Sequence, residues 1–269
     1  MYAFEYQRPA DRAAAVAAAA GADTRYLAGG QSLIQAMRLR LSQSERLVDL
    51  GGIADLRRIE ADGDGVKIGA MATHAAVAAH ADVRRLLPGL AELAEGIGDP
   101  MVRNMGTIGG SVANADPAAC YPAAVLALNA TIHTDRRTIA GDAFFTGLFE
   151  TALQPGEMIT ALSFPAVREA AYIKYKQQAS RFALVGVFVA RTPHGVRVAV
   201  TGAKGHVFRA TPIEDALSED FTAEAAKAVS MPVDDINGDL HGSAEYRAAM
   251  ISVIASRTVT KALANGARR

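Results

Sequence analysis

Two glycine-rich stretches are the parts of this sequence best suited to bind an anionic ligand. They are Ala28-Gly29-Gly30-Gln31-Ser32-Leu33 and Thr107-Ile108-Gly109-Gly110-Ser111. Glycine has no Cβ atom, so its backbone can adopt unusual φ values and its N–H groups can approach a ligand closely. Such turns can bind a diphosphate through backbone dipoles, without a lysine or a metal ion. A plain glycine turn would explain either stretch alone, whereas two similar stretches indicate one shared ligand.

Polar side chains next to the second stretch extend this candidate site. Thr107, Ser111 and Asn114 add hydroxyl and amide groups beside the predicted N–H groups. Other chemistry finds little support. Gly96 and Gly98 begin a G-x-G-x-x-G pattern, but Met101 interrupts it, and no P-loop, G-x-S-x-G or H-E-x-x-H motif occurs. The sequence therefore predicts a site in which a cofactor, and not a nucleophile–base pair, carries the reaction.

The composition excludes several classes of protein. Lys plus Arg and Asp plus Glu each total 28, so the chain has no basic excess for nucleic acid. No apolar run reaches the roughly 18 residues of a membrane span, and the first residues lack a secretory signal pattern. One cysteine, Cys120, permits no internal disulfide and no four-cysteine metal cluster. We therefore expect a cytoplasmic protein that provides no metal site of its own.

The two glycine stretches require elements that bring them together. Residues 1–55 predict a small β-α-β-like lobe whose glycine loop joins a strand to a helix starting at Ser32. Residues 56–166 predict a second lobe with a hairpin, a helix that Thr73 caps and that ends before Pro88, and the central glycine loop. Residues 167–269 predict a C-terminal domain with a three-stranded antiparallel sheet and later helices. His74 and His80 are six residues apart, so we expect solvated or internally hydrogen-bonded histidines and not metal ligands.

These motifs resemble a known family. The two glycine stretches are similar to the FAD diphosphate loops of the flavoprotein, or medium, subunit of molybdenum hydroxylases of the carbon monoxide, xanthine and nicotine dehydrogenase type. The segments 149–157, 175–181 and 200–203 are also similar to motifs of that family. The resemblance implies an α+β fold. It comprises a two-lobed FAD-binding domain of the vanillyl-alcohol-oxidase-like type and a C-terminal domain like that of the carbon monoxide dehydrogenase flavoprotein.

The resemblance also implies individual FAD contacts. Ala28 through Leu33 would hold the diphosphate from one side, and Thr107, Gly109, Gly110 and Ser111 from the other. Asn114 and Asp116 would reach ribose or ribityl hydroxyls, and Ile159 would offer a main-chain contact near the adenine. Lys176 would extend from the C-terminal domain toward the flavin, where a cation stabilises the anionic reduced ring. Taken alone, Lys176 is equally compatible with a solvated lysine of an edge strand.

Cys120 departs from the family pattern. It stands four residues after Asp116, where the family often has an acidic residue. A thiol accepts hydrogen bonds poorly, so a hydroxyl contact to FAD would be lost or replaced by water. Alternatively, Cys120 is simply a small buried residue at the start of a helix.

The function implied by the resemblance is electron transfer. A large partner with a molybdenum–pterin cofactor would oxidise the substrate, and a small partner with [2Fe–2S] clusters would pass the electrons to FAD in this chain. The complex would be a dimer of heterotrimers. Two alternatives remain open on the sequence: a self-sufficient FAD-dependent oxidase or reductase of the same fold class, and a non-enzymatic nucleotide-binding module.

Overall fold

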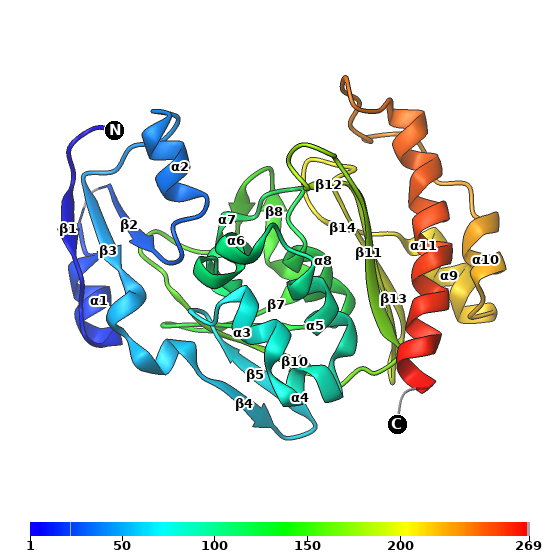
Figure 1. The fold of residues 1–269 in the computed structure, drawn as a ribbon, viewed down its shortest axis with the longest axis horizontal. Helices are drawn as coiled ribbons and strands as arrows, with labels where there is room; N and C mark the ends of the chain where they lie inside the picture. The colour runs from blue at the N-terminus through cyan, green and yellow to red at the C-terminus, as the bar shows by residue number, and fades with distance from the viewer. Residues whose placement is uncertain (22, 268–269) are drawn as a thin grey trace.

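The computed structural model describes residues 1–21 and 23–267 of the 269-residue chain. In that part the fold is mixed α/β, with four sheets whose strand orders are β1-β3-β2, β4-β5-β10-β6-β7, β11-β12-β13-β14 and β8-β9. Figure 1 shows the first sheet at one end of the long axis, the C-terminal sheet toward the other end, and helices α3 to α8 between them.

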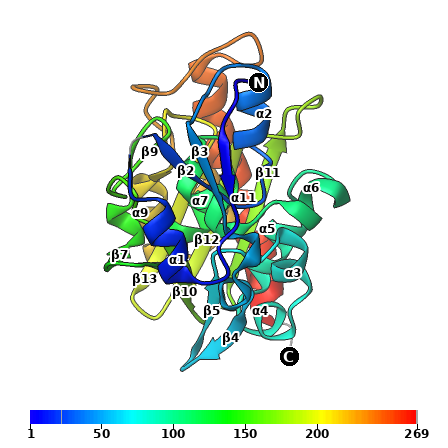
Figure 2. The ribbon, with the colours of Figure 1, turned by 90° about the vertical axis from the view of Figure 1, so that its left-hand side faces the viewer.

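The N-terminal sheet carries the first glycine stretch. Its strands are parallel, and Asp11 caps the first helix by accepting a hydrogen bond of 2.8 Å from the Ala14 N–H. The glycine stretch connects β2 to α2, and Figure 2 looks onto this sheet. The elements are β1 (Glu5–Gln7), α1 (Arg12–Ala18), β2 (Thr24–Leu27), α2 (Leu33–Arg38), β3 (Arg46–Asp49) and two 3-10 turns (Leu50–Gly52, Ala54–Arg57).

The middle of the chain forms a five-stranded antiparallel sheet with a set of short helices. The strands are β4 (Ile59–Asp62), β5 (Gly65–Gly69), β6 (Thr131–Thr134), β7 (Thr138–Ala140) and β10 (Ile159–Pro165). The helices are α3 (His74–Ala79), α4 (Ala81–Leu86), α5 (Pro88–Glu95), α6 (Pro100–Met105), α7 (Ile108–Asn114) and α8 (Tyr121–Ala127). A 3-10 turn (Gly141–Ala143) and a small hairpin, β8 (Phe145–Gly147) and β9 (Glu150–Thr151), follow α8 and β7.

Two expectations for this region are wrong. The central glycine stretch is not a loop, because Asp99 caps α6 and Thr107 caps α7 through their side chains. The helix expected from Thr73 to Pro88 is divided into α3 and α4, because His80 has extended backbone angles of φ −66° and ψ 130°. Asp99 and Thr107 are residue types that commonly cap helices, but the nearby glycines favoured the prediction of a loop.

The C-terminal sheet has four strands, and the prediction of three is wrong. The strands are β11 (Ala170–Lys176), β12 (Ala183–Thr192), β13 (Gly195–Thr201) and β14 (Phe208–Arg209). The fourth has only two residues, which pair with Ala199 and Val200, so no alternating pattern reveals it. The helices are α9 (Thr211–Glu219), α10 (Ala223–Ala228) and α11 (Ala244–Ala267).

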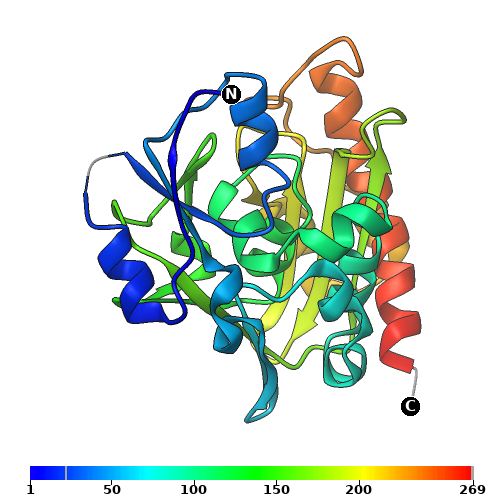
Figure 3. The same ribbon diagram turned by 60° about the vertical axis from the view of Figure 1, so that its left-hand side comes forward.

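The central strand of the C-terminal sheet is buried on both faces. Side chains of β12 alternate, so Phe188 joins the large central core while Val187 and Val189 join the core beneath the C-terminal helices. Figure 3 shows the sheet lying between the central helices and α11. This packing fixes β11 beside the central helix α5. Among the described residues, no helix is both long and apolar enough to cross a bilayer.

Candidate functional site

The predicted site residues converge on one cavity of about 420 Å³. It lies where the end of β2, the α6–α7 junction, the start of α8 and the β11–β12 turn meet. Fourteen of the fifteen residues predicted to contact the cofactor line it, and Lys176 does not. The fourteen are Ala28, Gly29, Gly30, Gln31, Ser32, Leu33, Thr107, Gly109, Gly110, Ser111, Asn114, Asp116, Cys120 and Ile159.

The first glycine stretch presents free backbone donors to the cavity. Gly30 has φ +70°, a left-handed conformation that favours glycine, and it turns the chain from β2 into α2. Within the described chain, the four N–H groups from Gly29 to Ser32 donate no backbone or side-chain hydrogen bond. Ser32 occupies the N-cap position of α2, yet its hydroxyl makes no capping bond. This stretch can therefore give several donors to an anion.

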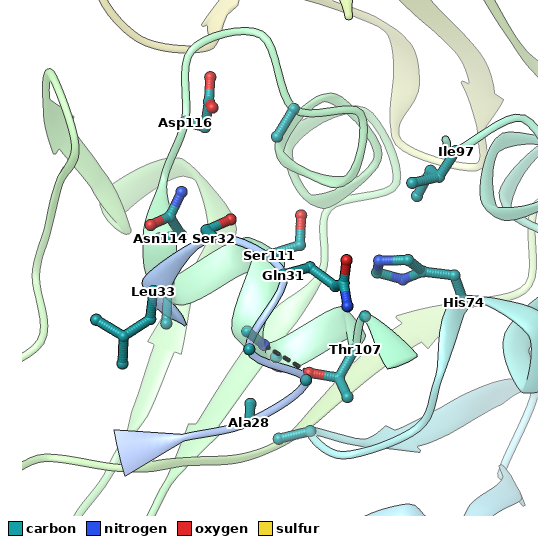
Figure 4. Close-up of a pocket in the computed structure, with 18 of the residues that line it drawn as sticks. Ala28, Gln31, Ser32, Leu33, His74, Ile97, Thr107, Ser111, Asn114 and Asp116 are labelled. Carbon is teal, nitrogen blue, oxygen red and sulfur yellow. Dashed lines mark hydrogen bonds between the residues drawn. The ribbon is translucent and has the colours of Figure 1, made fainter. Parts of the chain in front are cut away.

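The second glycine stretch is built differently from the expectation. Its N–H groups are already used: Ile108 and Gly109 donate to the Ala72 and Ala70 carbonyls at 3.0 and 2.9 Å, and Gly110 donates to the Thr107 Oγ1 at 3.2 Å. Figure 4 marks this last bond. Gly109 and Gly110 are helical and have no positive φ. The second stretch therefore offers mainly the hydroxyls of Thr107 and Ser111, which Figure 4 shows at the cavity.

One glycine in each stretch is required for close packing. A Cβ on Gly109 would lie 2.5 Å from the Ala70 Cβ, and one on Gly29 would lie 2.1 Å from the Met105 carbonyl oxygen. Real Cβ atoms do not approach other atoms so closely. Gly29 therefore packs against the backbone of Met105 and Gly106, just before the second stretch, with no space for a side chain between them.

Asn114 and Asp116 lie at one side of the cavity, as Figure 4 shows. Ala115 between them has φ +48°, which ends α7 in a left-handed turn. The Oδ1 atom of Asp116 accepts a hydrogen bond of 2.8 Å from the Ala118 N–H, and burial raises the pKa of this carboxyl group. The remaining carboxylate oxygen has no hydrogen bond to a described residue, so it can accept one from a ligand hydroxyl.

Lys174 takes the position at the cavity that was expected for Lys176. Both lysines belong to β11, and its pairing with β12 shifts register between Tyr175 and Lys176 because β12 has one extra residue there, Leu184. Lys174 lines the cavity, whereas Lys176 is the last residue of β11, is exposed and does not line it. The Lys174 Nζ lies 3.3 Å from the Sγ atom of Cys120, which is buried at the N-cap of α8. Cys120 is buried and also lines the cavity, so its position does not distinguish between the two interpretations.

Ile159 and the neighbouring residues Glu157 and Met158 also line the cavity. Glu157 is buried and accepts hydrogen bonds from the Arg137 Nε and the Gln154 N–H at 2.9 and 2.8 Å. The Arg137 guanidinium is the main reason why the pKa of Glu157 falls to about 2. Tyr26 donates a hydrogen bond of 3.1 Å to the Gly156 carbonyl, and burial raises its pKa to about 12. These bonds hold the 154–159 segment against β2.

His74 is a cavity residue that the sequence did not predict. It is only 5% exposed, and its Nδ1 atom has no hydrogen-bond partner among the described residues. The Nδ1 atom is therefore neither solvated nor hydrogen-bonded to a described residue, contrary to the expectation. The spacing of the two histidines excluded a metal site but said nothing about a pocket. In the described part of the chain, no group of three or more His, Cys, Asp or Glu side chains could hold a metal ion.

Known proteins share both the sequence and the fold of this chain. Residues 2–167 match the family described as the FAD binding domain in molybdopterin dehydrogenase. The chain is 35% identical to the nicotine 6-hydroxylase medium subunit of Paenarthrobacter nicotinovorans, over 89% of this chain and 90% of that protein. It is also 35% identical to the carbon monoxide dehydrogenase medium chain of Hydrogenophaga pseudoflava, over 97% of each.

Solved structures agree with these relatives. A chain of the carbon monoxide dehydrogenase from Hydrogenophaga pseudoflava that lacks the Mo-pyranopterin moiety superimposes with a TM-score of 0.88, at 36% identity over 98% of both chains. A chain of quinoline 2-oxidoreductase from Pseudomonas putida 86 gives a TM-score of 0.89, at 26% identity over 99% of both chains. The likeness thus extends over the whole fold, including the C-terminal sheet and helices.

Proposed function

The chain belongs to the family of FAD-binding domains of molybdopterin dehydrogenases and is the flavoprotein subunit of such an oxidoreductase, and we propose that its cavity holds one FAD between the two glycine stretches. The observation that carries this proposal is the row of four unpaired N–H groups from Gly29 to Ser32. A diphosphate is the part of FAD that requires such donors, and the left-handed turn at Gly30 lets consecutive N–H groups converge. The residues present therefore fit the cofactor.

The other proposed contacts use residues that line the same cavity. Ile159, which lines the cavity, is the proposed main-chain contact to the adenine, and the hydroxyls of Thr107 and Ser111 are proposed to hold the diphosphate together with the first stretch. Asn114 and Asp116 are the proposed partners of ribose or ribityl hydroxyls. Bound FAD would accept and release electrons, while these side chains bind and orient it.

We propose Lys174, in place of Lys176, as the cation beside the flavin. Lys174 lines the cavity and contacts Cys120, whereas Lys176 lies outside the lining. A nearby cation stabilises the anionic reduced flavin and raises its potential.

Electrons reach this subunit from partner chains in the proposed complex. The sequence has one cysteine, so it cannot supply the roughly four ligands of a [2Fe–2S] cluster. We propose a large subunit with the molybdenum–pterin cofactor, a small iron–sulfur subunit and a dimer of such heterotrimers, located in the cytoplasm. We also propose the division into residues 1–55, 56–166 and 167–269, with the first two forming an FAD-binding domain of the vanillyl-alcohol-oxidase-like type.

Anaerobic reduction separates electron transfer from self-sufficient catalysis. The isolated FAD-loaded chain is mixed with carbon monoxide, an aldehyde, a purine and an N-heterocycle, and the flavin absorbance is followed. We expect the flavin to remain oxidised in the lone chain and to be reduced by one of these compounds in the native complex. Rapid bleaching of the lone chain by any of them contradicts the proposal and supports an oxidase or reductase of the same fold class.

A further inference from the structure

His74 is held rigidly beside the second glycine stretch. It is the first residue of α3, its N–H donates a 3.0 Å hydrogen bond to the Gly106 carbonyl, and Thr73 before it pairs with Thr107 in a β-bridge. Figure 4 shows the imidazole pointing toward the same part of the cavity as the side chains of Gln31 and Ser111. The backbone thus fixes the position of the ring, and the ring faces the ligand space.

The imidazole lacks the internal partners that buried polar groups normally have. Its Nδ1 atom is unpaired within the described structure, and a Cβ on Gly106 would lie 2.5 Å from its Nε2 atom. Five side-chain atoms are buried and unpaired in the described residues, and only this one belongs to a residue that lines the cavity. An unpaired buried polar group costs about 1–3 kcal/mol. Such a cost is commonly retained where a ligand or water provides the missing partner.

The surroundings of His74 favour an uncharged ring. Burial, followed by the positive charge of Arg103, lowers the pKa of His74 to about 4. A neutral imidazole has one N–H donor and one acceptor nitrogen. Near it, Ile97 and Val102 provide apolar walls to the cavity. A space with apolar walls and neutral hydrogen-bonding groups suits a flat heteroaromatic ring better than a phosphate, which prefers a cation.

We propose that His74 is a cofactor-binding residue whose neutral imidazole hydrogen-bonds to the heteroaromatic flavin ring of FAD. This inference rests on the proposed function, and it adds a contact that neither glycine stretch provides. The imidazole can turn about its Cβ–Cγ bond, which exchanges its nitrogen and carbon positions. With no internal partner to fix the orientation, the bound ring selects the one that forms the bond.

Replacement of His74 should have opposite effects on the empty protein and on binding. His74→Phe keeps an aromatic ring and removes both nitrogens. The apoprotein is expected to keep its Tm or gain a few degrees, because an unsatisfied polar group disappears. The Kd for FAD, measured by calorimetric titration of the apoprotein, is expected to rise about tenfold, which equals about 1.4 kcal/mol. His74→Asn, which retains a donor and an acceptor, should recover most of this loss.

The control is His80→Phe on the same segment. His80 also has an unpaired Nδ1 atom but does not line the cavity, so its replacement should leave the Kd unchanged. A wild-type Kd in His74→Phe overturns the proposal. A marked fall in the Tm of the apoprotein would assign His74 a structural role and would also overturn the proposal. The same holds if His74→Phe and His74→Leu fail to fold while His74→Asn binds FAD normally. Absence of FAD binding by the wild-type chain in the same titration would instead reject the proposed function.

Discussion

Gly29→Ala should separate the two glycine stretches and weaken FAD binding. The added Cβ would lie 2.1 Å from the Met105 carbonyl oxygen and 2.8 Å from the Gly106 Cα. Both contacts are backbone atoms, so no side chain can rotate away. An ordinary contact of 3.4 Å requires a displacement of about 1.3 Å along the shorter approach. Overpacking of this kind costs typically about 1–3 kcal/mol.

The displacement acts directly on the proposed diphosphate donors. A shift of this size lengthens a hydrogen bond of ordinary length beyond about 4 Å, where it no longer stabilises the complex. Loss of one hydrogen bond to a charged group costs about 1.5–3 kcal/mol, so the Kd for FAD should rise about 10- to 100-fold. The assay is a calorimetric titration of apoprotein, accompanied by a Tm measurement. Gly205→Ala is the matched control, because its Cβ would meet nothing within 4 Å. Wild-type affinity in folded Gly29→Ala would refute the reasoning.

Three further predictions concern charged and titratable groups. Lys174→Met should make the flavin potential more negative by some tens of millivolts, where ~30 mV equals about 1.4 kcal/mol for two electrons. Lys176→Met should leave the potential unchanged, because Lys176 does not line the cavity. Both potentials can be measured by dye equilibration, and equal shifts would contradict the assignment. Burial lowers the pKa of His74 to about 4, so between pH 6.5 and pH 4 the unfolded state binds a proton that the folded state does not. The free energy of unfolding should therefore fall by up to about 3 kcal/mol over this range. Denaturant titrations of His74→Phe should lack this pH dependence. Glu157→Gln should lower the free energy of unfolding at pH 7 by about 1–3 kcal/mol, because it removes the carboxylate that Arg137 contacts. The pKa of Glu157 is lowered to about 2, so the greater stability of the wild type should be present above pH 4.5 and lost toward pH 2. An unchanged denaturation midpoint would contradict this.

The sequence predicted the cavity residues well because glycine clusters and polar side chains are local signals. Gly30 illustrates this, since its left-handed turn between β2 and α2 agrees with the predicted strand–loop–helix order. The role of Gly109 was less visible. Its need for a missing Cβ arises from Ala70, which is far away in sequence, so a turn and a close packing contact look alike before folding.

Lys174 and His74 show what local patterns could not supply. A strand period of two assigns residues 174 and 176 to the same face, but only Lys174 lines the cavity, because Lys176 ends β11 in an exposed position. His74 lines the cavity because its backbone pairs with Gly106, a contact between distant segments. The two-residue strand β14 likewise exists only through its pairing with β13. In each case tertiary contacts decide the outcome.

The flavin content of the native complex tests the central claim most directly. Native mass spectrometry of the chain purified with its partners measures the mass of each subunit and of every bound cofactor. We predict one FAD per copy of this chain, retained when the chain is dissociated gently from a large and a small subunit. A folded chain that carries no flavin, with FAD found on another subunit or nowhere in the complex, would contradict the account.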